Sequence, residues 1–335
     1  MIQFAINKAY FLQALHTTRR AISSKNAIPI LSTIKIEVTS DGIYLTGSNG
    51  QISIENSISV SEENAGLLIT QPGSILLEAN FFINVVSSLP DVTLTFEEIE
   101  QYQVLLKSGK SEITLKGKDV EQYPRIQEVD SLTPLLMDTK VLKSIIAETS
   151  FAASTQESRP ILTGVHFILE NQKLLAVATD SHRLSQRVIP TEQAVEDFNI
   201  VIPGKSLTEL SRSLTNEEEM VEISIMENQV LFKTETMYFY SRLLEGNYPD
   251  TNRLIPTSHN TQIEFYVPEL LSAIERASLL SHEGRNNIVR LSISPDSVVL
   301  YGNSPEIGKV EEALNYENVS GEALDISFNP DYMKD

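Results

Sequence analysis

Three consecutive residues, Asp180, Ser181 and His182, are of the types that hydrolases combine into a catalytic triad. In such a triad a histidine takes the proton of a serine hydroxyl, and a carboxylate holds the histidine in the required tautomer. Neighbouring side chains of an extended segment point to opposite faces, so these three cannot converge if the segment is extended. We therefore expect no catalytic residue. A hydrolase built around these three residues remains one hypothesis for the chain, beside two non-enzymatic hypotheses given below.

Two other triplets resemble part of a phosphate-binding loop, Gly109-Lys110-Ser111 and Gly204-Lys205-Ser206. The complete motif carries another glycine five residues before the glycine that precedes the lysine. Those positions hold Val104 and Asn199. Neither triplet predicts a nucleotide site, and we expect no cofactor.

The histidines and cysteines give no indication of a metal site. The sequence has no cysteine, which excludes thiolate ligands, disulfides and cysteine nucleophiles. His166 lies on the polar phase of a predicted strand, so we expect it at the surface. None of the histidines shows the spacing of metal ligands; they are His16, His166, His182, His259 and His282.

The net charge of −19 argues against tight, non-specific binding to phosphate groups, which depends on lysine and arginine. The charge is distributed unevenly. Five predicted helices (residues 7–25, 73–89, 138–159, 203–216 and 268–285) together carry a small positive charge, so the strands and loops carry the whole negative excess. Either solvated charge is partitioned by chance, or the helices face an anionic partner.

Targeting and membrane signals are not found in the sequence. The first ten residues, MIQFAINKAY, lack the basic and apolar regions of a signal peptide. No apolar run approaches the roughly 18 residues that a membrane span requires. We expect a cytoplasmic protein without a membrane partner.

The elements that must position these residues are repeated about every 125 to 130 residues. Three helical apolar triplets share the spacing i, i+1, i+4 and begin at Phe11, Val141 and Leu270. The dipeptides Tyr123-Pro124 and Tyr248-Pro249 recur at a similar interval. One supersecondary unit used three times predicts an arc or part of a ring.

Each repeat is predicted to run helix, strands, helix, strands. Alternating residues such as Ile34, Ile36 and Val38 give each sheet one buried and one solvated face. Amphipathic helices bury their apolar stripes on that sheet. The predicted fold class is α+β, with three tandem two-layer domains over residues 1–125, 126–253 and 254–335.

The third repeat is shorter than the second. Asn329-Pro330-Asp331 has the composition of a helix start, and the sequence ends a few residues later. By the symmetry of the repeats, we expect the third domain to be incomplete by roughly 40 residues.

Several segments resemble the bacterial sliding clamp family, the beta subunit of DNA polymerase III. The resemblance covers the whole chain in order, and its most specific motif is Ala-Thr-Asp-x-His-Arg-Leu at residues 178–184. The other segments are Pro29-Ile30-Leu31, Leu45-Thr46-Gly47, Gly246-Asn247-Tyr248-Pro249-Asp250, Arg253-Leu254-Ile255-Pro256 and Ile326-Ser327-Phe328-Asn329.

The resemblance implies a DNA-clamp fold in which each domain packs two helices on antiparallel sheets, and in which the chain is half of a six-domain ring. A head-to-tail homodimer would encircle duplex DNA without sequence specificity. It would be a processivity factor and a non-catalytic subunit of a DNA polymerase holoenzyme, associated with the nucleoid. By tethering the polymerase, it would raise the concentration of the polymerase at the primer end.

The partners that the resemblance implies are double-stranded DNA, a second copy of the chain, the replicative polymerase alpha subunit and the clamp loader. Other polymerases and repair proteins would bind through short linear motifs. The alternative hypothesis is a peptide-binding scaffold that does not encircle DNA. Retention on circular DNA would separate these two hypotheses.

Two of the interfaces implied are a DNA-binding surface and a pocket for partner peptides. DNA contacts are expected, by similarity, from Lys25 and Gln156 and, on grounds of charge, from Arg19, Arg20, Lys205 and Arg212. The family usually has glycine at the position of Ser181. The positions that match the peptide pocket are Thr179, Ser181, His182, Arg183, Leu184, Pro249, Arg253, Leu254, Asn329 and Tyr332.

The third interface joins domain one of one chain to domain three of the next. An apolar centre with a rim of opposite charges is the expected anatomy. The candidates are Lys107, Lys110, Ile113 and Leu115 on one side, and Leu279, Leu280, Glu306 and Glu311 on the other. Ile113 and Leu115 have an alternative interpretation as core residues of an edge strand.

Overall fold

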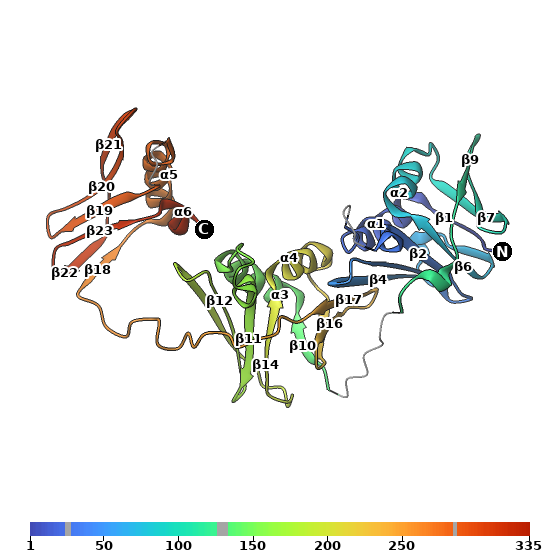
Figure 1. The fold of residues 1–335 in the computed structure, drawn as a ribbon, viewed down its shortest axis with the longest axis horizontal. Coiled ribbons are helices and arrows are strands. Elements are labelled where there is room, and N and C mark those ends of the chain that lie inside the picture. Colours follow the sequence, from blue (N-terminus) through green and yellow to red (C-terminus); the bar gives the residue numbers. More distant parts are fainter. Residues whose placement is uncertain (24–27, 126–132, 284–286) are drawn as a thin grey trace. The chain divides into compact units, whose positions relative to one another are not determined.

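The computed structural model describes residues 1–23, 28–125, 133–283 and 287–335, with only the backbone of residues 282 and 283. These form two compact units, Met1–Tyr248 and Pro249–Asp335, and each is described by itself (Figure 1). The first unit contains both the first and the second predicted repeat.

The first repeat consists of strands around two long helices. Residues 1–125 hold β1 (Gln3–Asn7), α1 (Lys8–Arg19), η1 (Pro29–Ser32), β2 (Thr33–Val38), β3 (Gly42–Ser48), β4 (Ile52–Ser59), η2 (Glu63–Ala65), β5 (Leu68–Gln71), β6 (Gly73–Glu78), α2 (Ala79–Ser88), β7 (Thr93–Glu100), β8 (Gln103–Ser108), β9 (Ser111–Lys116) and η3 (Val120–Gln122).

The second repeat follows the same order. It holds β10 (Leu135–Asp138), α3 (Thr139–Thr149), η4 (Ser150–Ala152), η5 (Pro160–Thr163), β11 (Gly164–Glu170), β12 (Lys173–Thr179), β13 (Leu184–Pro190), β14 (Phe198–Pro203), α4 (Gly204–Ser213), β15 (Met220–Ile225), β16 (Gln229–Lys233) and β17 (Met237–Arg242).

One antiparallel sheet joins the two repeats. Its strand order is β10-β15-β16-β17-β4-β3-β2-β6, so that four strands come from each repeat. The junction is the pairing of β17 with β4, in register from Met237 opposite Asn56 to Ser241 opposite Ile52. A continuous main-chain ladder therefore holds the first two repeats in one unit.

Each repeat of the first unit has its own apolar core. In the first repeat, α1 and α2 share one core with the eight-stranded sheet and with a second sheet of order β5-β1-β7-β8-β9. The rings of Phe4, Phe11, Phe82 and Phe96 meet there, with Phe4 stacked on Phe96 at 4.8 Å between centroids. In the second repeat, α3 and α4 share one core with the large sheet and with a sheet of order β13-β12-β11-β14.

The helices begin and end at residues that differ from the predicted ranges. The predicted helix over residues 73–89 is wrong in its first part, because Gly73–Glu78 is strand β6 and pairs with β2. Ile75, Leu76 and Leu77 are all buried, and a strand buried on both faces lacks the alternation that would distinguish it from a helix. Glu78 then caps α2, since its carboxylate accepts the backbone N–H of Phe81 at 2.7 Å.

The second unit contains one long helix on a small sheet. It holds β18 (Thr261–Glu264), α5 (Val267–Glu283), β19 (Val289–Ser294), β20 (Ser297–Ser304), β21 (Gly308–Ala313), β22 (Asn318–Gly321), β23 (Leu324–Phe328) and α6 (Pro330–Lys334). The sheet order is β21-β20-β19-β23, and β18 pairs with β22. The predicted helix start at Asn329 is confirmed, because Asn329 Oδ1 accepts the backbone N–H of Asp331 at 2.9 Å. In the part of the chain that the structure describes, no helix is long and apolar enough to cross a membrane.

Candidate functional site

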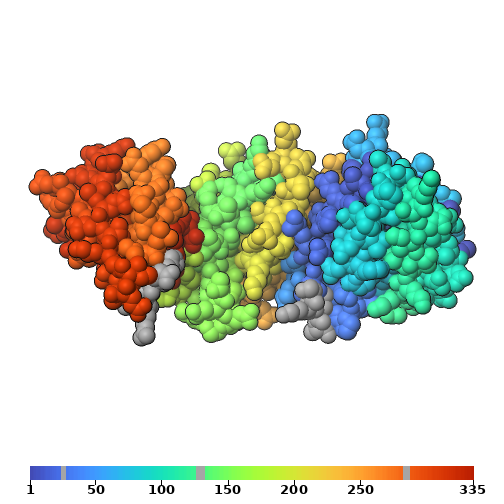
Figure 2. Space-filling model, turned by 90° about the horizontal axis from the view of Figure 1, so that it is seen from above, coloured from blue at the N-terminus to red at the C-terminus, as the bar shows by residue number. Residues whose placement is uncertain are grey.

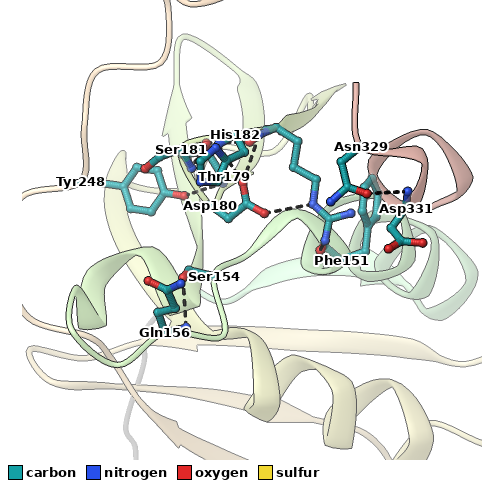
Figure 3. A network of polar contacts seen from close by, with 11 residues as sticks. Phe151, Ser154, Gln156, Thr179, Asp180, Ser181, His182, Tyr248, Asn329 and Asp331 are labelled. Atoms are coloured by element: carbon teal, nitrogen blue, oxygen red, sulfur yellow. Dashed lines mark hydrogen bonds and ion pairs between the residues drawn. The ribbon is translucent and has the colours of Figure 1, made fainter. Parts of the chain in front are cut away.

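The segment after β12 is a tight turn rather than the extended segment assumed for Asp180, Ser181 and His182. Thr179 organises it, because its Oγ1 donates to the carbonyl of Arg183 at 2.7 Å and accepts the N–H of Ser181 at 3.1 Å. Ser181 has a φ of 79°, in the left-handed region that favours glycine. The turn is therefore held in a conformation that few residue types adopt easily (Figure 3).

Asp180 and Arg183 stabilise this turn from inside. Asp180 Oδ1 accepts the N–H groups of His182 and Arg183 at 2.9 and 3.0 Å, while its Oδ2 pairs with Arg183 Nε at 3.1 Å. The guanidinium of Arg183 also donates to the carbonyl of Phe151 at 2.7 Å and lies over the ring of Phe151. The carboxylate of Asp180 thus has a structural role in the turn.

Tyr248 anchors the start of the turn. Its hydroxyl accepts the backbone N–H of Thr179 at 3.0 Å (Figure 3). Burial raises the pKa of Tyr248, and the hydrogen bond from Thr179 opposes that shift. The ring of Tyr248 lies 4.7 Å from the ring of His166, between centroids.

The prediction of a surface position for His166 is wrong. Its side chain is 7% exposed, and its Nε2 lies 2.6 Å from Asn199 Oδ1. The strand β11 is paired on both sides, with β12 and β14, and Tyr248 covers the imidazole. Burial lowers the pKa of His166, while the hydrogen bond to Asn199 raises it in part.

The residues predicted for the peptide pocket are divided between the two units. The first unit holds Thr179, Ser181, His182, Arg183 and Leu184, and the structure brings these five together in one turn. In the second unit, Leu254 is 57% exposed, Arg253 and Pro249 are exposed, and Tyr332 is partly exposed. Asn329 caps α6 and also accepts a hydrogen bond from Asn287 Nδ2 at 3.1 Å.

Four residues that support the turn were missed by the sequence analysis: Phe151, His166, Asn199 and Tyr248. The repeated Tyr-Pro dipeptide marked Tyr248 as a joint between repeats, which was the one available signal. Its contacts with His166 and Thr179 join residues far apart in the sequence. No local pattern predicts such contacts.

Helices α1, α2, α3 and α4 lie along one side of the first unit, where the DNA contacts are expected (Figure 1). Arg20 directly follows α1 as its C-cap, and its guanidinium lies 3.6 Å from Glu209 on α4. Arg212 pairs with the other oxygen of the same carboxylate at 3.0 Å. Figure 2 shows the yellow surface of α4 beside the blue surface of α1. The structure therefore brings Arg20 and Arg212 together around one carboxylate.

The remaining DNA candidates occupy separate positions. Arg19 Nε donates to Asn80 Oδ1 on α2 at 2.8 Å. Lys205 is 95% exposed, 4.0 Å from Glu157. Gln156 lies in an exposed loop, where its backbone N–H donates to Ser154 Oγ at 3.1 Å (Figure 3). Lys25 lies outside the described residues.

The candidates for the dimer interface lie on or near two edge strands and on one helix. Ile113 and Leu115 are on β9 of the first unit, and Glu311 is on β21 of the second. Lys107 is on β8, Lys110 and Glu306 are in turns, and Leu279 and Leu280 are on α5. Leu115 is only 7% exposed and belongs to the core, so the alternative interpretation as a core residue holds for Leu115. Ile113 is partly buried and packs against the same core. Leu279 is 70% exposed. Of the other candidates, Lys107 pairs with Glu97 at 3.7 Å, Leu280 is half-buried, and Lys110, Glu306 and Glu311 are exposed.

The fold is that of a DNA polymerase clamp subunit. Residues 2–127 match the model of the DNA polymerase III beta subunit N-terminal domain, residues 136–250 the central domain, and residues 252–335 the C-terminal domain. The chain belongs to the DNA polymerase III beta-subunit family.

Its relatives include the beta sliding clamp of Streptococcus pneumoniae strain TIGR4, 64% identical over all of this chain and 89% of the relative. The crystal structure of the DNA polymerase III beta chain from that strain has a TM-score of 0.97 and 63% identity, and covers 100% of this chain and 89% of the other. The beta subunit from Streptococcus pyogenes has a TM-score of 0.96 and 59% identity, with 99% and 89% covered.

These similarities confirm three predictions: the family, the three-domain clamp fold, and the function of a processivity clamp. They also confirm that the chain is a non-catalytic subunit, so the hydrolase hypothesis is wrong. The processivity clamp is favoured over the peptide-binding scaffold.

Proposed function

We propose that two copies of this chain join head to tail into a ring that encircles duplex DNA and slides along it without sequence specificity. The observation that carries this proposal is the arrangement of the first unit, where four helices lie on one side of two joined repeats (Figure 1). The helix α1 contains no carboxylate, although the chain as a whole has a net charge of −19. The acidic remainder repels DNA from other surfaces, so the duplex is favoured only along the helices.

The DNA contacts are assigned to side chains on or beside these helices. Weak and sequence-independent contacts with phosphate groups suit a ring that must slide. The exposed lysine side chain of Lys205 supports this assignment. The set of proposed contacts is Arg19, Arg20, Lys25, Gln156, Lys205 and Arg212.

The ring closes through β9 of one copy and β21 of the next. Both strands are the outermost strands of their sheets, and an unpaired edge is a template for pairing with another chain. Leu279, exposed on α5, supplies apolar surface beside this contact, together with Leu280 and Ile113. The opposite charges of Lys107 and Lys110 on one copy and Glu306 and Glu311 on the next form its rim.

Partner proteins bind at the 179–184 turn of the first unit, and the candidate residues of the second unit supply further contacts with the bound peptide. The rigid turn supports this role, because a preorganised surface loses less entropy when a peptide binds. Leu184, Leu254 and Pro249 supply apolar contacts, and Arg183, Arg253 and His182 supply donors. Thr179, Ser181, Asn329 and Tyr332 complete the proposed contacts. The ligands are short linear motifs of the polymerase alpha subunit, the clamp loader, other polymerases and repair proteins, which place the protein at the nucleoid.

The domain boundaries that we propose are residues 1–125, 126–253 and 254–335. The Tyr-Pro dipeptides near each boundary support them. Limited proteolysis tests them, because exposed connections between domains are cut first. Cleavage mainly within the proposed domains would contradict these boundaries.

Retention on circular DNA tests encirclement. The protein is assembled on a nicked circular plasmid with a clamp loader, isolated by gel filtration, and the plasmid is then cut once. A ring stays on the circle and is lost from the linear molecule, because its hold is topological. Equal retention on both forms, or retention on neither, would contradict the proposal. The control is the same complex on the uncut nicked circle, held for the same time, from which the protein should not be lost.

A further inference from the structure

One carboxylate lies among the basic residues of the helical side of the first unit. Glu209 is on the face of α4 that also carries Lys205 and Arg212, which precede and follow it by four and three residues. Its Oε1 is 3.0 Å from Arg212 Nη1, and its Oε2 is 3.6 Å from Arg20 Nη1. One acidic group therefore engages two of the arginines proposed to contact DNA.

The carboxylate of Glu209 is less exposed to solvent than either of the two arginines. The side chain of Glu209 is 27% exposed, while Arg20 and Arg212 are 37% and 61% exposed. The contact of Arg20 with Glu209 crosses from the end of α1 in the first repeat to α4 in the second. Exposed ion pairs contribute little to stability, and the continuous β4–β17 ladder already joins these repeats. The small contribution of these ion pairs to stability therefore does not account for a carboxylate at this position.

We propose that Glu209 limits the affinity of the helical surface for DNA by competing with phosphate groups for Arg20 and Arg212. This inference rests on the proposed function, in which that surface faces the duplex. A phosphate oxygen and a carboxylate oxygen use the same guanidinium donors. While Glu209 holds the arginines, fewer counterions are released from DNA on binding, so the contact is weaker and less dependent on salt. A weaker contact keeps the ring mobile.

The test replaces Glu209 with glutamine, which removes the charge and nearly preserves the shape of the side chain. The matched control is Glu222→Gln. Glu222 pairs with Lys233 at 3.0 Å, and its neighbours Val221 and Ile223 are buried in the core, so Glu222 points to the opposite face of the sheet. Both variants change the net charge by the same amount. Only the first removes a carboxylate from the helical surface.

Affinity for a short fluorescent duplex is measured by anisotropy at several salt concentrations, with the full chain. Each further phosphate neutralised raises affinity by roughly 5- to 10-fold near 0.1 M salt. We therefore expect Glu209→Gln to bind several-fold more tightly, with a steeper dependence on salt, and Glu222→Gln to bind like the wild type. In the Arg20→Gln, Arg212→Gln background the gain from Glu209→Gln should disappear.

The outcomes separate this inference from the function on which it rests. If the wild type is retained on circular DNA but Glu209→Gln binds the duplex no more tightly than the wild type, the inference alone is overturned. An equal gain for Glu222→Gln would also overturn it, because the effect would then come from net charge. Loss of wild-type retention on circular DNA, the test of encirclement, would overturn the proposed function as well. Thermal unfolding of each variant verifies that it is folded, and Glu209→Ala replaces Glu209→Gln if the latter is unfolded.

Discussion

The imidazole of His166 lies against the phenol ring of Tyr248, with centroids 4.7 Å apart and planes inclined by 36°. This contact links the central strand β11 to the last residue of the first unit. Because the hydroxyl of Tyr248 accepts the N–H of Thr179, the same ring also fixes the start of the 179–184 turn. The shape of the proposed peptide-binding turn thus depends on a buried pair of rings.

Replacing Tyr248 with phenylalanine should keep the ring contact and remove the acceptor for the Thr179 N–H. Leaving a partly buried donor unpaired costs about 1–3 kcal/mol. We expect a loss of that size in the free energy of unfolding, measured with urea. The matched control is Tyr44→Phe, because the hydroxyl of Tyr44 has no hydrogen-bond partner among the described residues. An equal loss in both variants would contradict the role given to Tyr248.

The stability of the first unit should depend on pH through His166. Since burial lowers the pKa of His166, the unfolded state binds more protons than the folded state just below the ordinary value of about 6.5. The free energy of unfolding should therefore fall as the pH falls below that value, until the folded-state pKa is reached. A His166→Gln variant should lose this part of the pH dependence. Identical slopes in urea unfolding for the variant and the wild type would show that His166 does not titrate in this way.

Replacing Ser181 with glycine should not destabilise the protein. Left-handed backbone costs a non-glycine residue about 1–2 kcal/mol, which glycine avoids, while its greater freedom in the unfolded state offsets part of that gain. The expected change is a gain of up to about 1 kcal/mol in the free energy of unfolding. In the control, Ser211→Gly in α4, glycine should cost about 0.5–1 kcal/mol. A loss at both positions would be incompatible with strain at Ser181.

Two leucine substitutions should separate the core of the first unit from the dimer contact. Leu115→Ala removes a buried side chain and should destabilise the protein by about 2–5 kcal/mol. Leu279→Ala removes an exposed side chain and should leave unfolding nearly unchanged, while it weakens dimerisation in analytical ultracentrifugation. Unchanged dimerisation in Leu279→Ala would remove this residue from the proposed interface.

Local patterns predicted the features that depend on local physics. The alternation at Ile34, Ile36 and Val38 marked β2, and the Asn-Pro-Asp sequence marked the start of α6. Both depend on side chains within a few residues of each other. The apolar face of a strand and the cap of a helix need no information from distant parts of the chain.

Other features depend on pairing between distant segments. The burial of His166 follows from strands on both sides of β11 and from Tyr248, about 80 residues further on. The sequence predicts a helix at β6, because the pairing of this strand with β2, about 40 residues earlier, leaves no signal within residues 73–78. The contact of Arg20 with Glu209 likewise requires the β4–β17 junction that brings α1 beside α4. Local sequence patterns therefore identify candidate residues, but they do not identify the distant residues that these candidates contact in the fold.

The β4–β17 ladder also has a mechanical consequence. Five residue pairs in antiparallel register must separate before the first two repeats can move apart. Separating this ladder breaks several main-chain hydrogen bonds at once, so we expect the two repeats to move together as one body. If the proposed ring opens to admit a duplex, we expect it to open outside this junction, at contacts that do not require the strands of a sheet to separate.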